Sequence, residues 1–187
     1  CTETVQKEKE LLKAFPYKEG YSLYIGIPFC PSTCLYCSFT SYSIDQFQNI
    51  VQDYLEALLK ELDFVAKTYA HKELQTMYIG GGTPTSLKEE DLEYLLYEVN
   101  KRFPFSKIQE ITVEAGRPDS LNFEKLKILK KYGVTRISIN PQSMNDKTLK
   151  LIGRNHFAQD IKEKFNLARQ AGIDNINMDM ICGLPEE

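Results

Sequence analysis

Apolar residues along the chain follow two different periods. Short runs rich in β-branched and aromatic residues predict strands. Five such runs occur, at residues 21–28, 76–79, 108–114, 134–140 and 176–182. Between them apolar residues recur at every third or fourth position, which is typical of helices with one buried face. The predicted helices cover residues 45–69, 86–102, 121–132, 146–152 and 157–171.

Local signals mark several of the predicted helix ends. Ser86 and Glu89 have the spacing of a capping box, which predicts a helix start at Ser86. Gly133, Gly153 and Gly172 each follow a predicted helix. Glycine is favoured just beyond a helix because it accepts a positive φ.

The alternation of strands and helices predicts an α/β fold with a parallel sheet and helices outside it. Two architectures remain open, a doubly wound open sheet and a full or partial barrel. No Gly-x-Gly-x-x-Gly fingerprint follows the first strand, which disfavours a dinucleotide-binding fold. Residues 1–20 are rich in Lys and Glu and are expected to form a leading helix or tail before the main domain, residues 21–187.

Composition narrows the class of protein. The chain has 187 residues, 42% hydrophobic and 26% charged, enough for one globular domain with a sizeable core. The net charge of -3 is spread over mixed signs, which argues against a nucleic-acid partner. No apolar run reaches the length of a membrane span.

Five cysteines are an odd number and they are clustered, which does not suit a disulfide framework and favours a reducing, cytoplasmic location. The chain begins at Cys1, which is the pattern of a lipidated cysteine or of a fragment. It also stops just after the fifth predicted strand, so we expect a fragment of a longer protein.

Three of the cysteines, Cys30, Cys34 and Cys37, have the spacing Cys-x3-Cys-x2-Cys after the first strand. Three thiolates on one loop can ligate three irons of a [4Fe–4S] cluster and leave the fourth iron open for chemistry. A zinc site more often shows paired Cys-x2-Cys units or a nearby histidine, and His71 is far along the chain. Three inert cysteines are a further alternative, but they would not explain the polar pattern that follows.

Glycines and polar residues stand at or near the ends of the other predicted strands. They are Gly80 to Thr83, Glu114, Asn140 with Gln142, and Asp179, which lies two residues after Asn177. In β/α barrels the chemistry gathers at the carboxyl ends of the strands, so these residues are predicted to share one rim with the cysteine loop.

Each of these residues also has a structural interpretation. The glycines can form a tight turn or allow a ligand to approach the backbone, and Glu114 can be a solvated strand end. Arg154 can be a surface arginine or a clamp on a carboxylate through its planar fork. His156 can cap the helix that follows it. A carboxylate at Asp179 would need a partner if it were buried.

Taken in order, the motifs resemble the radical S-adenosylmethionine (SAM) superfamily and, within it, the oxygen-independent coproporphyrinogen III oxidase (coproporphyrinogen dehydrogenase) family. The resemblance runs from about Tyr21 to the last residue. The segments that carry it are residues 24–30, 80–85, 139–143, 153–156 and 179–185.

The resemblance implies a partial (β/α)6 barrel of the radical SAM type, here truncated after the fifth strand. Residues 21–187 would then be an incomplete radical SAM core domain. One barrel edge would be open, and exposed edges pair readily with other strands. We therefore expect the fragment alone to be inactive, and a dimer through this edge would fit.

The resemblance also implies the cofactors. Cys30, Cys34 and Cys37 would ligate a low-potential [4Fe–4S] cluster. SAM would chelate the open iron and be cleaved to a 5′-deoxyadenosyl radical. The residues at positions that contact SAM in the family are Tyr24, Tyr36, Gly81, Gly82, Thr83, Glu114, Gln142, Arg154 and Asp179.

The implied activity is anaerobic decarboxylation of coproporphyrinogen III to protoporphyrinogen IX in haem biosynthesis, with an electron donor such as flavodoxin or ferredoxin. Founding members carry a further cysteine where this chain has Phe39, and residues 116–119 look more like a divergent branch. The alternatives are a haem-binding chaperone on the same barrel, whose branch also lacks that cysteine, a haem-modifying radical SAM methyltransferase, and a metal-free structural domain.

Overall fold

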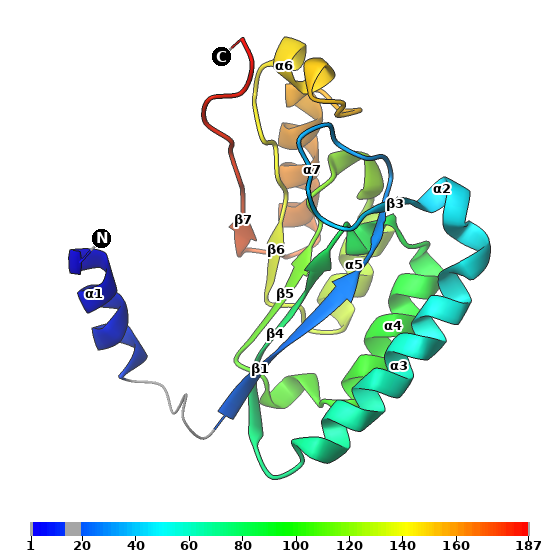
Figure 1. The fold of residues 1–187 in the computed structure, drawn as a ribbon, viewed down its shortest axis with the longest axis vertical. Coiled ribbons are helices and arrows are strands. Elements are labelled where there is room, and N and C mark those ends of the chain that lie inside the picture. The colour runs from blue at the N-terminus through cyan, green and yellow to red at the C-terminus, as the bar shows by residue number, and fades with distance from the viewer. Residues whose placement is uncertain (1, 14–19, 187) are drawn as a thin grey trace.

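The computed structural model describes residues 2–13 and 20–186 (Figure 1). Expectations about Cys1 and about residues 14–19 fall outside this part of the chain. The strands are β1 (Gly20–Ile27), β2 (Phe29–Cys30), β3 (Tyr42–Ser43), β4 (Glu73–Gly81), β5 (Glu110–Glu114), β6 (Arg136–Ser138) and β7 (Ile176–Asn177). The α-helices are α1 (Thr2–Leu12), α2 (Ile44–Phe47), α3 (Val51–Thr68), α4 (Glu89–Arg102), α5 (Phe123–Lys131), α6 (Asp146–Leu151) and α7 (Ala158–Gln170). Four 3-10 turns complete the fold: η1 (Gln48–Ile50), η2 (Pro84–Ser86), η3 (Phe105–Lys107) and η4 (Pro118–Ser120).

The five main strands form a parallel sheet in the order β1-β4-β5-β6-β7, so each new strand is added on the same side of the last. Parallel crossovers are right-handed, and a sheet that grows in one direction therefore carries its connecting helices on one face. A doubly wound sheet needs a reversal of strand order, which this sheet lacks. The partial barrel is thus confirmed over the open sheet.

The core lies between the sheet and its helices. Alternate strand residues Ile25, Ile79 and Val113 are fully buried and stand in register across β1, β4 and β5. The facing helices contribute a stripe of leucines that includes Leu55 and Leu95. Figure 1 shows α3 and α4 side by side along this face. By contrast, α1 buries no side chain.

Two helix predictions differ from the structure. Helix 45–69 starts close to the predicted position with α2, but Phe47 leaves helical geometry and the turn η1 divides α2 from α3, which begins at Val51. The capping box at Ser86 and Glu89 is wrong. Pro84 starts a 3-10 turn that ends at Ser86, and Lys88 precedes α4 without a side-chain cap.

The C-terminal half follows the sequence prediction more closely. The glycines after α5, α6 and α7 all have φ between 74° and 80°, as their place just beyond a helix requires. The fifth strand is shorter than predicted, since β7 covers two residues and one further bridge joins Gln142 to Met180. None of the helices in the described ranges has the length and apolarity to cross a membrane.

Candidate functional site

A cavity of about 310 Å³ opens at the carboxyl ends of the strands, and every predicted site residue lines it. These residues are Tyr24, Cys30, Cys34, Tyr36, Cys37, Gly81, Gly82, Thr83, Glu114, Gln142, Arg154 and Asp179. The structure therefore brings together residues from all five β/α units on one rim, as the barrel rule predicted.

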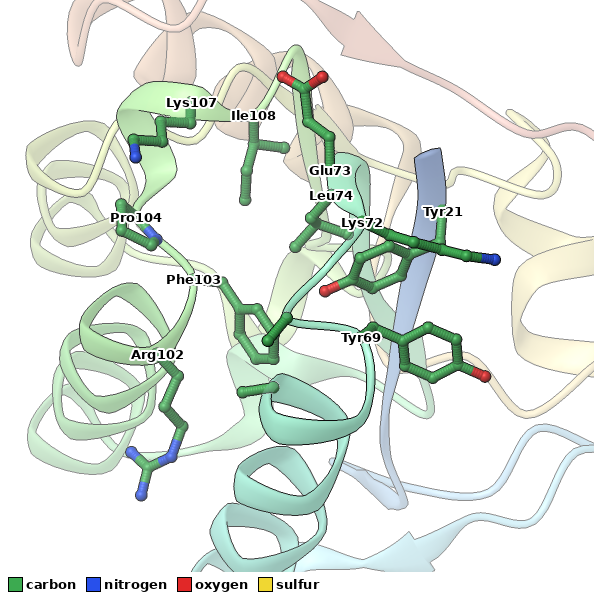
Figure 2. A pocket seen from close by; sticks show the side chains of 12 residues that line it. Tyr21, Tyr69, Lys72, Glu73, Leu74, Arg102, Phe103, Pro104, Lys107 and Ile108 are labelled. Atoms are coloured by element: carbon green, nitrogen blue, oxygen red, sulfur yellow. The ribbon is translucent and has the colours of Figure 1, made fainter. Parts of the chain in front are cut away.

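A second cavity, of about 410 Å³, lies at the amino ends of β1 and β4 (Figure 2). It is lined by Tyr21, Tyr69 and Phe103, with the rings of Tyr21 and Tyr69 stacked 5.1 Å apart. It contains no cysteine and none of the predicted site residues. The chemistry of this chain is therefore expected at the opposite end of the sheet.

The cysteine loop is fixed by backbone hydrogen bonds at several points. Cys30 ends β2, and the Cys37 N–H donates to the Cys34 carbonyl at 3.1 Å. The Leu35 N–H donates to the carbonyl of Ile152, at the end of α6, at 3.1 Å. The three cysteines carry free thiols, and Cys34 is buried whereas the other two are partly exposed. The loop is thus shaped by the rest of the rim.

The glycine segment, Gly80 to Thr83, lies against the start of the cysteine loop and is joined to it by backbone hydrogen bonds. The N–H groups of Gly82 and Thr83 donate to the carbonyls of Ile27 and Phe29, both at 2.7 Å. A Cβ on Gly82 would lie 2.7 Å from the Phe29 oxygen, so only glycine allows this approach. The hydroxyl of Thr83 lies 3.5 Å from the Sγ of Cys30. The glycine segment therefore positions Cys30.

The carboxylate of Glu114 lines the cavity and is held by two hydrogen bonds. The Tyr78 hydroxyl donates to it at 2.5 Å, and the Gly81 N–H donates to it at 3.2 Å. Burial raises the pKa of Glu114, these two hydrogen bonds oppose the rise, and nearby Asp179 adds to it. The ring of Tyr24, which is exposed, stacks on Tyr78 at 5.8 Å. Glu114 is therefore a held acceptor and not a solvated strand end.

Arg154 is buried, which excludes the surface-arginine interpretation. Its Nη2 donates to the carbonyls of Gly116 and Asn140, and its Nη1 donates to the Tyr36 hydroxyl at 3.4 Å. Nη1 also lies 3.9 Å from Cys34 Sγ, while the buried Nε has no partner. Burial is the main reason that the pKa of Tyr36 rises to about 12, and Arg154 opposes this rise. In this structure Arg154 joins three segments of the rim.

Gln142 and Asp179 form the edge of the site. Gln142 has a φ of 66°, and its backbone pairs with the carbonyl of Asp179 and the N–H of Ile181. Asp179 is exposed, so the burial considered for it does not occur, and its carboxylate accepts from the Asn177 amide at 2.8 Å. Asp179 lies beyond the end of β7 at Asn177, and this hydrogen bond joins the side chains of the two residues.

Sequence reasoning missed one buried residue beside the site and misinterpreted a second. Arg117 donates to Cys34 Sγ at 3.3 Å, although it had been considered only as a marker of a divergent branch. An arginine two residues before an aspartate, at the end of a rim strand, was the available signal. His156 is not a helix cap, since it is 4% exposed and neither ring nitrogen has a partner. Burial, with Arg154 adding, lowers the pKa of His156 to about 4.

The residues present fit an iron–sulfur cluster. All three thiols line one cavity, an arginine already donates to one of them, and the missing Cβ of Gly82 leaves room beside another. Across residues 2–13 and 20–186, no three cysteine, histidine or acidic side chains converge closely enough for a single metal ion. A four-iron cluster does not need such convergence because each thiolate binds its own iron.

Comparison with known proteins shows which proteins this chain resembles. The chain is 48% identical to the oxygen-independent coproporphyrinogen-III oxidase-like protein HemZ of Bacillus subtilis, over 91% of this chain and 34% of that protein. It is 46% identical to the heme chaperone HemW of Bacillus subtilis, over 88% of this chain and 43% of that protein. It thus spans less than half the length of these curated relatives.

The fold matches a solved structure closely. Coproporphyrinogen III oxidase (HemN) from Escherichia coli, described as a radical SAM enzyme, superposes with a TM-score of 0.79 at 29% identity. The match covers 96% of this chain and 41% of that one. The family model of the Radical SAM superfamily matches residues 24–187, a range that includes every residue lining the site cavity. The chain therefore belongs to the radical SAM superfamily, whose cofactors are a [4Fe–4S] cluster and SAM.

Proposed function

We propose that Cys30, Cys34 and Cys37 hold the [4Fe–4S] cluster and that the other residues predicted for the rim bind SAM. The observation that carries this assignment is the single cavity that all of these residues line. When bound and reduced, the cluster would supply the one electron that splits SAM into methionine and a 5′-deoxyadenosyl radical. The protein supplies the binding, the orientation and the electrostatics.

The chain's own groups suit these tasks. Glu114, held by Tyr78 and Gly81, presents carboxylate lone pairs to a hydroxyl or amine of the ligand. Asp179 is exposed on the same rim and is available as a second acceptor. Arg154 also lines the cavity, and its guanidinium is the cation proposed to pair with a ligand carboxylate.

For the whole protein, we propose haem binding as the principal function. Phe39, at the position of the additional cysteine of founding members, is 73% exposed. It lines both the site cavity and a neighbouring cavity of about 300 Å³ beside Gly82 and Tyr54. An exposed aromatic face there suits a flat macrocycle, since aromatic rings gain from stacking. Relatives named heme chaperone HemW, from Bacillus subtilis and Escherichia coli, support the same class of ligand.

A second candidate is oxidative decarboxylation of coproporphyrinogen III. The fold match to Escherichia coli HemN and the name of the Bacillus subtilis HemZ relative favour it. Both candidate functions involve a tetrapyrrole, which is bound in the first and converted in the second. Haem binding and porphyrinogen turnover must therefore be measured side by side.

The test uses the full-length protein, reconstituted anaerobically with iron and sulfide. Haem is titrated spectroscopically into wild type and Phe39→Ala. Phe64→Ala is the matched control, because Phe64 is similarly exposed, at 70%, on α3 and away from the rim. The same preparations receive reductant, SAM and coproporphyrinogen III, with 5′-deoxyadenosine and protoporphyrinogen measured together.

We expect saturable haem binding that weakens about tenfold in Phe39→Ala, equivalent to about 1.4 kcal/mol, and is unchanged in the control. Protoporphyrinogen formation that requires SAM, without haem binding, would select the decarboxylase. Equal haem affinity in wild type and Phe39→Ala would show that Phe39 does not contribute to haem binding. A preparation that takes up no cluster would refute the cofactor assignment itself.

A further inference from the structure

Arg117 makes a contact to the cysteine loop that the fold alone does not require. Arg117 is 3% exposed and follows β5, which ends at Glu114, after Ala115 and Gly116. Its Nη1 donates to the Cys34 Sγ at 3.3 Å and to the Ser32 carbonyl at 3.0 Å. An arginine that belongs to the third strand unit thus reaches a cysteine 83 residues earlier in the chain.

Arg117 is held so that this contact has a fixed direction. Asp119 accepts from Nε at 3.0 Å and from Nη2 at 2.8 Å, and Ser32 Oγ accepts from Nη2 at 2.9 Å. With the two bonds from Nη1, all five guanidinium N–H donors have partners. The turn η4 starts at Pro118 and contains Asp119, whose two carboxylate oxygens accept from Nε and Nη2 of Arg117. The donor to sulfur therefore cannot rotate away without breaking a bidentate pair.

The three cysteines have different surroundings. Cys34 lies 3.3 Å from Arg117 and 3.9 Å from Arg154, so two guanidinium groups face the same sulfur. Cys30 instead faces the neutral Thr83 hydroxyl at 3.5 Å. The thiol of Cys34 is thus contacted by both guanidinium groups.

Given the cluster proposed above, we infer that Arg117 is a positioning residue that raises the reduction potential of the cluster through Cys34. N–H···S hydrogen bonds withdraw electron density from cluster sulfurs and favour the reduced, more negative form. Asp119 neutralises much of the charge of Arg117 at longer range. The directed hydrogen bond, and not the net charge, therefore carries the effect.

A purely structural role for Arg117 predicts a different result. If it only tied η4 to the loop, its loss would lower stability or iron content and leave the potential of the assembled cluster unchanged. The midpoint potential per assembled cluster therefore separates the two roles.

The experiment compares the full-length wild type with Arg117→Gln, Arg117→Lys and Arg136→Gln after anaerobic reconstitution. Arg136 is the matched control, since it lies on β6 and pairs with Glu110 at 3.6 Å, away from the cysteines. Iron and sulfide are quantified first, and the midpoint is then measured without SAM by a redox titration followed by electron paramagnetic resonance.

We expect Arg117→Gln to lower the ratio of reduced to oxidised cluster about tenfold at a fixed potential, equivalent to about 59 mV for one electron. Arg117→Lys should lie between wild type and Arg117→Gln, and Arg136→Gln should match wild type. A fully loaded Arg117→Gln with the wild-type midpoint overturns the inference. If Arg117→Gln assembles no cluster, the midpoint potential of Arg117→Lys is the deciding measurement. A wild-type midpoint potential in Arg117→Lys would then overturn the inference. Failure of the wild type to take up a cluster would instead refute the proposed function.

Discussion

A methyl group on Gly82 would test whether the glycine segment positions the cysteine loop. The Cβ of Gly82→Ala would lie 2.7 Å from the Phe29 oxygen, 2.8 Å from the Ile27 oxygen and 3.1 Å from the Cys30 Sγ. Carbon–oxygen contacts of this kind normally lie at about 3.3 Å or more. Two of the three atoms belong to the backbone, so no side chain can rotate to relieve the contact.

The cost follows from the bonds that this crossing uses. The two carbonyls accept from the N–H groups of Gly82 and Thr83 at 2.7 Å, so a retreat of the segment weakens both hydrogen bonds. Each contributes about 1 kcal/mol, and overpacking costs about 1–3 kcal/mol. We expect Gly82→Ala to lower the free energy of unfolding by about 3 kcal/mol. It should also lower cluster content, because Cys30 must move.

The assay is urea unfolding of the iron-free protein, followed by iron and sulfide analysis after anaerobic reconstitution. Gly26→Ala is the matched control on the neighbouring strand. There the nearest atom to an added Cβ is Tyr24 Cε1 at 3.7 Å, an ordinary contact, so the change should stay within about 1 kcal/mol. Wild-type stability together with full iron content in Gly82→Ala would refute the reasoning.

Two further predictions concern titrating groups. His156 has a pKa lowered from 6.5 to about 4, so the folded state takes up its proton later than the unfolded state as pH falls. The neutral, buried His156 should therefore lower the free energy of unfolding by about 3 kcal/mol as the pH falls from 6.5 to 4. Urea unfolding of His156→Leu over this range should lack that part of the pH dependence. A pH dependence equal to that of the wild type would contradict the prediction. Tyr78→Phe removes the 2.5 Å hydrogen bond to Glu114, which opposes the rise of that carboxyl's pKa. The Glu114 pKa should therefore rise further, as an infrared pH titration with Glu114→Gln as the blank would measure, and a fall would contradict the assignment.

The periodicity of the sequence was sufficient for the elements and the rim. Runs rich in β-branched and aromatic residues, which include Ile25 and Ile79, predicted strands, and both residues are buried in β1 and β4. Parallel strands end at one edge, so the cysteine loop and Glu114 were expected together, and they line one cavity. The choice between open sheet and barrel needed the strand order, which local patterns do not contain.

The misses have a common physical origin. Ser86 has the residue type and spacing of a cap, but Pro84 commits the backbone to a 3-10 turn first. Arg117 and Cys34 are 83 residues apart, so no local pattern could predict their contact. His156 precedes a helix, as a cap would, yet packing buries it without a partner. Tertiary contacts outweigh local propensity in each case.

The charges around the cavity are separated. Arg117 and Arg154 both face the thiol of Cys34. Glu114 takes its hydrogen bonds from the neutral groups of Tyr78 and Gly81, and its nearest charged influence is Asp179. One part of the cavity thus carries the two guanidinium groups, whereas another carries the carboxylates of Glu114 and Asp179. SAM carries a carboxylate, an ammonium, a sulfonium and ribose hydroxyls, so a ligand with both signs of charge suits a cavity divided in this way. The separation supports the proposed cofactor pocket independently of the spacing of the cysteines.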